Sequence, residues 1–208
     1  EAFCVLRGEP MTGKERLAAT CQGAMTGLGD DFFDKQRLSE QGVKDFIENP
    51  AVFTGNSASE KLFLHFYKTA LANAPQPVQM QQQLFNVFHA QLLSKQQDVP
   101  GLSYEVIKDI TIRKGAESLL FYRTGFEHPM RKGEEKMLYS LGGLMQLSND
   151  IFDVYKDRQG GVSTLITSAS NLEDLRFYYS ALLQTGTEAA YRSGYAKKDV
   201  KKFLGILS

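Results

Sequence analysis

The sequence predicts an all-α protein, a single-domain helical bundle over residues 1–208. Three observations support this fold class. Apolar residues recur at helical spacing along most of the chain, and strand-like alternation bounded by turns is scarce. Capping residues, prolines and glycine pairs divide the chain into segments of helical length. No internal repeat, charged tail or flexible linker marks a domain boundary, and 208 residues are enough for one sizeable core.

In the N-terminal half we expect a helix from about Lys14 to Asp34. A short helix runs from Ser39 to Glu48 and stops at Asn49-Pro50, because the residue before a proline disfavours α geometry. Ser57 or Ser59 caps a helix that runs through Ala72, and Pro77 opens another that ends before Pro100.

In the C-terminal half Ser103 caps a segment that extends to about Phe126. A long helix from about Lys132 to Asp157 ends at Gly160-Gly161, since glycine commonly follows a helix end. Asn171 caps a helix towards Tyr195, and Lys197 to Leu207 forms the last one.

The amino-acid composition limits the kinds of molecule and the cellular location that we expect for this protein. Basic and acidic residues balance to a net charge of zero, which argues against a nucleic-acid partner. No apolar run is long enough to cross a membrane. Cys4 and Cys21 have no metal-type spacing, and idle thiols suit a reducing, cytoplasmic location. Because the chain starts at Glu1 rather than at a methionine, we expect further N-terminal residues before it, with room for a targeting segment.

Two acidic segments carry the chemical interpretation. The first is Asp30-Asp31-Phe32-Phe33-Asp34, and the second runs from Asn149 to Asp157. A helix turns about 100° per residue, so Asp30 and Asp34 lie about 40° apart. By the same rule Asn149, Asp153 and Asp157 span only about 80°, with Asp150 beside them. Each helix therefore presents a stripe of oxygen atoms near its C-terminal end.

Such stripes are unfavourable without a cation. Like charges at i, i+4 repel, and a helix C-terminus already carries partial negative charge. Mg²⁺ reverses this balance, because it binds carboxylate oxygens together with substrate phosphates. A solvated acidic face explains either segment alone, but two matching segments in one small chain favour a metal site.

Glycines lie on the same helical faces as the acids. Gly23 and Gly27 fall on the face of Asp30, and Gly142 falls on the face of Asn149. Glycine is unfavourable inside a helix, so these positions need space. Either a cavity behind the metal site or close helix–helix packing accounts for them.

The two segments resemble the metal-binding motifs of class I isoprenoid synthases, a family of prenyl diphosphate synthases, squalene and phytoene synthases, and terpene cyclases. Asp30 to Asp34 is similar to the first aspartate-rich motif, and Asn149, Asp153 and Asp157 occupy the ligand positions of the second. Asp153 stands where cyclases have Ser or Thr, and Asp157 stands where they have Glu. The second segment is also similar to the DDxxD motif of chain-elongating synthases. The resemblance covers about residues 14–195.

The resemblance implies a helical bundle of the isoprenoid-synthase type with a central cavity, with both acidic segments at its mouth. It implies a prenyl diphosphate substrate held by Mg²⁺, typically three ions with substrate bound. The implied metal ligands are Asp30, Asp31, Asp34, Asn149, Asp150, Asp153 and Asp157.

Cationic and aromatic side chains complete the expected site. A diphosphate calls for basic donors, and Arg113, Lys114 and Arg158 are our candidates for the catalytic group. Aromatic faces stabilise a carbocation and exclude water from it. The residues that we expect to line the cavity are Phe33, Tyr122, Phe152 and Tyr155.

Within this interpretation Asn149 favours a terpene cyclase or a squalene/phytoene synthase-like reaction over chain elongation. The alternative is a non-catalytic member of the same fold that binds an isoprenoid or stabilises a partner. A di-iron carboxylate bundle is less favoured, because the acidic stripes contain no Glu-x-x-His motif. The sequence leaves a homodimer open.

Overall fold

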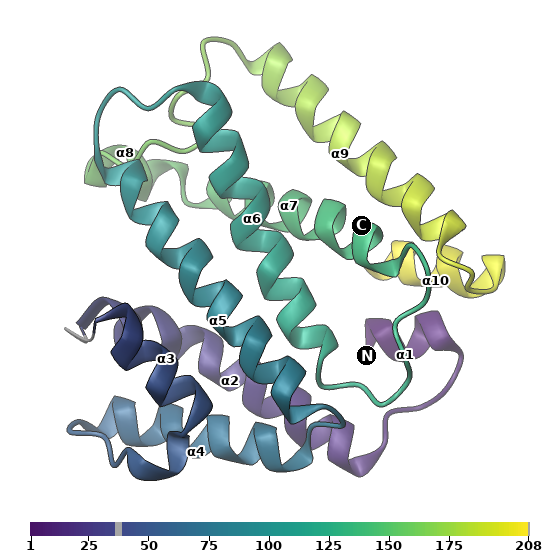
Figure 1. Cartoon of the computed structure of the whole chain (residues 1–208). Coiled ribbons are helices and arrows are strands. Elements are labelled where there is room, and N and C mark those ends of the chain that lie inside the picture. The colour runs from purple at the N-terminus through teal and green to yellow at the C-terminus, as the bar shows by residue number, and fades with distance from the viewer. Residues whose placement is uncertain (36–38, 208) are drawn as a thin grey trace. The chain divides into compact units, whose positions relative to one another are not determined.

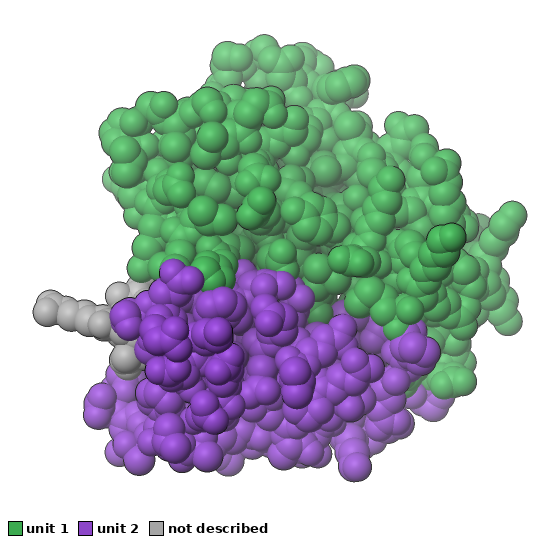
Figure 2. All heavy atoms as spheres, in the orientation of Figure 1, with its two compact units in different colours: residues 1–9, 89–120, 130–208 green, residues 10–88, 121–129 purple. Residues whose placement is uncertain are grey.

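Every regular element in the described part of the chain is a helix, which confirms the all-α prediction (Figure 1). The computed structural model describes residues 1–35 and 39–207, and for residues 30–35 it describes the backbone alone. The chain divides into two compact units, coloured in Figure 2. Unit 1 comprises residues 1–9, 89–120 and 130–208, and unit 2 comprises residues 10–88 and 121–129.

Unit 2 is built on four helices of the N-terminal half. These are α2 (Gly13–Lys35), α3 (Glu40–Glu48), α4 (Ala58–Asn73) and the first part of α5 (Pro77–Ser94), with the short 3-10 helix η1 (Pro50–Val52) after α3. Two predicted starts are confirmed by cap hydrogen bonds. The Ser39 hydroxyl accepts a bond from the Gly42 N–H, and the Ser57 hydroxyl accepts one from the Glu60 N–H.

A capping box fixes the start of α2. The Thr12 hydroxyl accepts a hydrogen bond from the Glu15 N–H at 3.2 Å, and the Glu15 carboxylate accepts one from the Thr12 N–H at 2.9 Å. The same buried carboxylate accepts a bond from the Glu127 N–H at 2.8 Å. Glu15 thus connects the start of α2 to the segment after α6 within unit 2.

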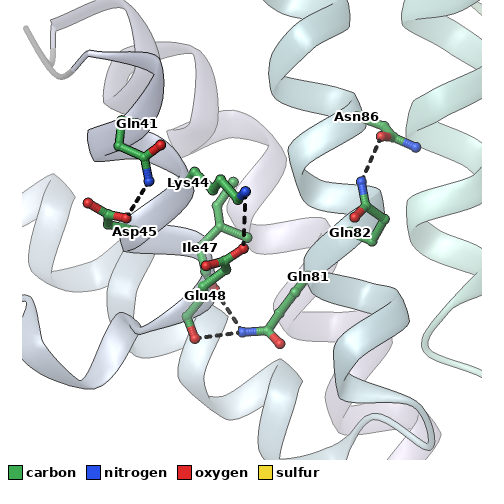
Figure 3. Close-up of polar contacts among 8 residues, drawn as sticks. All are labelled: Gln41, Lys44, Asp45, Ile47, Glu48, Gln81, Gln82 and Asn86. Atoms are coloured by element: carbon green, nitrogen blue, oxygen red, sulfur yellow. Dashed lines mark hydrogen bonds and ion pairs between the residues drawn. The ribbon is translucent and has the colours of Figure 1, made fainter.

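The last backbone carbonyls of α3 accept hydrogen bonds from side chains of other helices. The last carbonyls of a helix have no partner inside it. In Figure 3 the Gln81 amide donates to the carbonyls of Ile47 and Glu48, each at 2.9 Å. The Tyr67 hydroxyl also donates to the Ile47 carbonyl, at 2.7 Å. These bonds hold α3 against α4 and α5.

The core of unit 2 is rich in aromatic rings. Phe46, Phe63 and Tyr67 are fully buried with ring centroids about 6 Å apart, and Phe53 meets Phe46 edge-on at 5.2 Å. Met25 joins this cluster from α2, which packs along α4. Burial of these large side chains is the main source of stability for the unit.

Unit 1 contains the helices of the C-terminal half and one at the N-terminus. They are α1 (Ala2–Arg7), η2 (Lys95–Asp98), most of α6 (Tyr104–Arg123), α7 (Glu134–Phe152), α8 (Val154–Gly160), α9 (Leu172–Arg192) and α10 (Lys197–Leu207). The predicted cap at Asn171 and the predicted end at Gly160-Gly161 are confirmed, with Gly161 in the left-handed region at φ 71°.

Two helix boundaries and one additional helix differ from the sequence prediction. The long helix expected from Lys132 to Asp157 is two helices, since Asp153 (φ −88°, ψ 4°) separates α7 from α8. The helix expected to reach Phe126 ends at Arg123. There the Thr124 N–H bonds the Phe121 carbonyl, so the last turn tightens and ends the helix. The sequence analysis did not anticipate α1, whose Leu6 is buried in a cluster with Val200 and Phe203 of α10.

Two glycines allow α6 and α7 to approach each other closely in unit 1. A Cβ atom at Gly115 of α6 would lie 1.9 Å from the Gly142 carbonyl oxygen of α7. A Cβ atom at Gly142 would lie 2.5 Å from the Gly115 carbonyl oxygen. Helix α7 also packs along α9. No helix in residues 1–35 and 39–207 has the length and apolarity that a membrane crossing requires.

Candidate functional site

The second acidic segment lies where α7 passes into α8 in unit 1. Although the helix is interrupted at Asp153, the backbone keeps helical spacing on either side. The Asp153 N–H bonds the Asn149 carbonyl, and the Asp157 N–H bonds the Asp153 carbonyl, both at 2.9 Å. Asn149 and Asp153 are exposed, and Asp157 is half-buried. The three predicted ligand positions therefore remain one turn apart along a surface.

Asp150 differs from these three residues, because its side chain is only 7% exposed. One carboxylate oxygen accepts a hydrogen bond from the Gln146 amide at 2.9 Å, and the other accepts one from the Thr111 hydroxyl at 3.4 Å. Burial raises the pKa of Asp150, opposed by these hydrogen bonds and by the positive charge of Lys114. Asp150 thus links α7 to α6 beneath the exposed part of the segment.

One turn further along the chain, two negatively charged side chains lie close together. Burial raises the pKa of Asp157, and the neighbouring negative charge of Asp153 raises it further. The charges of Lys156 and Lys114 act in the opposite direction. A cation near Asp153 and Asp157 would relieve this repulsion, and carboxylate oxygens are the donors that a hard divalent cation prefers.

The three basic candidates have different surroundings. Lys114, half-buried on α6, is close enough to influence both Asp150 and Asp157. Arg113 forms an ion pair with Asp109 at 3.0 Å on the same helix. Arg158 is exposed in the last turn of α8. The structure therefore brings Lys114 to the acidic segment and engages Arg113 elsewhere.

The first acidic segment is the last part of α2 in unit 2. The side chains of Asp30, Asp31, Phe33 and Asp34 lie outside the described residues, so their predicted roles stay predictions. The prediction that both segments face one cavity also stays a prediction.

The part of α2 before that segment is described, and two of its glycines have open space beside them. A Cβ atom at Gly23 or Gly27 would meet no described atom of unit 2 within 4 Å. On the same helix the Thr26 hydroxyl is hydrogen-bonded to the hydroxyl of Tyr122, one of the predicted cavity residues. Gly142, by contrast, is explained by close packing against Gly115. The glycines were explained either by a cavity or by close helix–helix packing, and packing accounts for the glycine of α7.

The aromatic candidates beside the second segment are exposed. Phe152 is 86% and Tyr155 is 72% exposed, and the Tyr155 hydroxyl accepts a hydrogen bond from the Gln159 amide at 2.9 Å. Leu138, which shares the helical face of Phe152, is fully buried. This face of α7 therefore passes from the core to the surface as it nears the acids.

Two residues of this site were missed by the sequence analysis, namely Thr111 and Gln146. Each supplies a hydrogen bond to Asp150. Gln146 could have been found, because it lies four residues before Asp150 on the same helical face. Thr111 lies on another helix, and no sequence spacing signals its contact.

The described side chains include no group of three or more His, Cys, Asp or Glu residues arranged to hold a metal ion. A Mg²⁺ ion at this site would therefore depend on few carboxylates together with oxygen atoms of a substrate, as is usual for Mg²⁺. Comparison of the chain with protein-family models, curated proteins and solved structures gives no match.

Proposed function

We propose that this protein is a Mg²⁺-dependent isoprenoid synthase that ionises or condenses a prenyl diphosphate. The observation that carries the proposal is the arrangement at the α7–α8 junction. There an exposed amide and two carboxylates follow one another at single-turn spacing, with the charge of Lys114 nearby. This combination suits a ligand that brings both cations and phosphate oxygens.

The residues of the junction take separate tasks in this proposal. Asn149, Asp153 and Asp157 would hold the metal at the α7–α8 junction, and the family resemblance assigns further ligands to Asp30, Asp31 and Asp34. Asp150, whose oxygens already accept two hydrogen bonds, positions the segment instead. Lys114 donates to the diphosphate as a point charge. Bound Mg²⁺ stabilises the charge that develops on the departing pyrophosphate.

The resemblance of the second segment to cyclase motifs favours a terpene cyclase or a squalene/phytoene synthase-like reaction over chain elongation. The basis is Asn149, which opens the segment in place of an aspartate. Pyrophosphate leaves when the allylic carbon–oxygen bond breaks heterolytically, so both electrons of that bond remain on the leaving oxygen. The allylic cation then accepts the π electrons of a double bond in the same or in a second molecule, which forms a carbon–carbon bond and a new cation. Loss of a proton from that cation to the pyrophosphate or to water gives the neutral hydrocarbon part of the product.

A second function, binding of a prenyl diphosphate without turnover, is favoured by one observation. Phe152 is 86% exposed, and a ring in solvent does not keep water from a carbocation. Under this alternative the same acids and Lys114 hold the diphosphate, and no bond breaks.

Calorimetric titration with a non-hydrolysable thiolodiphosphate analogue of farnesyl diphosphate tests the site. We expect binding with Mg²⁺ and none with EDTA. Asp153→Ala and Asp31→Ala should each abolish it, whereas Asp98→Ala, at an exposed aspartate of η2, should leave it unchanged. Binding that persists in EDTA or in both variants would refute the metal-bridged site.

A further inference from the structure

The C-terminal helix α10 carries an unusually basic surface for a chain of zero net charge. Four lysines and one aspartate give Lys197–Leu207 a net charge of +3. We call Lys197, Lys198, Lys201 and Lys202 the lysine face. All four are exposed, and none has an ion-pair or hydrogen-bond partner within the described residues.

The packing of α10 directs these lysines to one side. Val200 and Phe203 are buried in a cluster with Leu6 of α1. On a helical wheel the lysine face occupies one continuous arc of about 140° beside this buried arc. Asp199, the only acid of the helix, lies outside it, and a Cβ atom at Gly8, the residue after α1, would lie 3.6 Å from the Asp199 carboxylate. The lysine charges are therefore not neutralised within the helix.

The N-terminal end of α10 carries a fifth cation. The Arg131 guanidinium lies over the ring of Tyr195, 4.2 Å from its centroid, and donates to the Gly194 carbonyl at 2.5 Å. This cation–π contact holds the guanidinium against Tyr195, which precedes Lys197 by two residues. At the other end of the helix two apolar side chains reach solvent, with Ile206 55% and Leu207 41% exposed.

We propose that α10 docks this protein on the surface of an anionic lipid bilayer. The lysine face supplies attraction to acidic headgroups, which is the usual role of a lysine cluster on an amphipathic helix. Exposed Ile206 supplies apolar contact with the bilayer, since it lies about 40° beyond Lys202 on the helical wheel, whereas Leu207 lies on the side of the buried arc. A nucleic acid would match the charge and would leave Ile206 without an apolar contact. The inference is independent of the proposed function.

Sedimentation with vesicles tests the proposal. We expect the protein to sediment with vesicles of phosphatidylcholine mixed with phosphatidylglycerol, and not with phosphatidylcholine alone. Each lysine near an anionic surface contributes about five-fold to partitioning, so Lys198→Gln with Lys202→Gln should weaken binding on the order of 25-fold. Raising the salt from 0.1 M to 1 M shortens the Debye length from about 10 Å to about 3 Å and should release the protein.

The matched control is Lys14→Gln with Lys61→Gln, which removes the same charge from exposed lysines of unit 2. It should sediment like the wild type. Circular dichroism melts should be alike for all three proteins, since only exposed side chains change. Equal binding to both kinds of vesicle, an equal loss in both double variants, or release from anionic vesicles by a short DNA duplex at equimolar charge would each overturn the proposal.

Discussion

At the residue scale, the acids of the α7–α8 junction divide into two kinds. Asp150 is buried and accepts two hydrogen bonds, whereas Asp153 is exposed and has a like charge one turn away. The first arrangement is what a structural carboxylate needs, and the second is what a ligand site needs. The two aspartates should therefore respond in opposite ways to truncation.

We predict that Asp150→Ala lowers the free energy of unfolding by about 1–3 kcal/mol, because Thr111 and Gln146 each lose a hydrogen-bond partner in a buried place. Asp153→Ala should change it by less than about 0.5 kcal/mol or raise it slightly, since it removes a repulsion. Urea unfolding of both variants in EDTA provides the comparison. A large loss for Asp153→Ala would show that this acid is structural.

Part of this site could be predicted from the sequence. Helical spacing was enough to group Asn149, Asp153 and Asp157, and their backbone bonds preserve that grouping. Spacing alone could not separate Asp150 from them, because its burial depends on Thr111 of another helix. The same limit applies to Arg113 and Lys114, which are adjacent in sequence but whose side chains have different neighbours.

At the scale of the elements, helix contacts depend on a few small or polar residues. The approach of α6 to α7 requires two glycines, and the end of α3 requires the Gln81 amide. Each of these two contacts can be tested by a substitution, with a control substitution elsewhere in the same protein.

Gly142→Ala should destabilise unit 1 by about 1–3 kcal/mol or more, because its Cβ atom would lie 2.5 Å from a backbone oxygen that cannot move freely. Gly23→Ala is the control, since no described atom of unit 2 lies within 4 Å and alanine favours the helix by about 0.5–1 kcal/mol. Thermal melts of the two variants should shift in opposite directions. Equal shifts would contradict the packing explanation.

Gln81→Ala should lower the free energy of unfolding by about 1 kcal/mol, because the Glu48 carbonyl loses this donor and the Ile47 carbonyl keeps only the Tyr67 hydroxyl among the described side chains. Gln82→Ala is matched to it, since the exposed Gln82 amide donates a hydrogen bond to Asn86 of the same helix (Figure 3). Hydrogen exchange of the α3 amides should accelerate in the first variant only. Unchanged exchange would mean that Tyr67 alone holds the helix end.

The sequence was more reliable for helix centres than for helix ends. Ser39, Ser57 and Asn171 were identified because their side chains cap in a known pattern. The Thr12–Glu15 capping box follows the same pattern and was overlooked. The interruption at Asp153 has no proline or glycine to signal it, and α1 depends on packing against α10.

At the scale of the whole molecule, the first acidic segment belongs to unit 2 and the second to unit 1. The proposed function assigns metal ligands to each of these units. A ligand that binds only the folded state stabilises it by about 2.7 kcal/mol at a hundred-fold excess over its dissociation constant.

We accordingly predict that Mg²⁺ together with the farnesyl thiolodiphosphate analogue raises the melting temperature, and that neither component alone does so. The second acidic segment should be required, so Asp157→Asn should reduce the shift. Differential scanning fluorimetry provides the measurement. If the analogue raises the melting temperature by the full amount in EDTA, it binds without a metal ion. That result would contradict the proposed site.

The central claim, that both acidic segments act on a prenyl diphosphate through Mg²⁺, is tested most directly by release of pyrophosphate. The protein is incubated with geranyl, farnesyl or geranylgeranyl diphosphate, with and without isopentenyl diphosphate. We predict release that requires Mg²⁺ with at least one substrate and that falls in Asp31→Ala and in Asp153→Ala. Asn149→Ala should reduce turnover more than affinity. No Mg²⁺-dependent release from any of these substrates would contradict the synthase account, and tight binding without release would identify a binding protein instead.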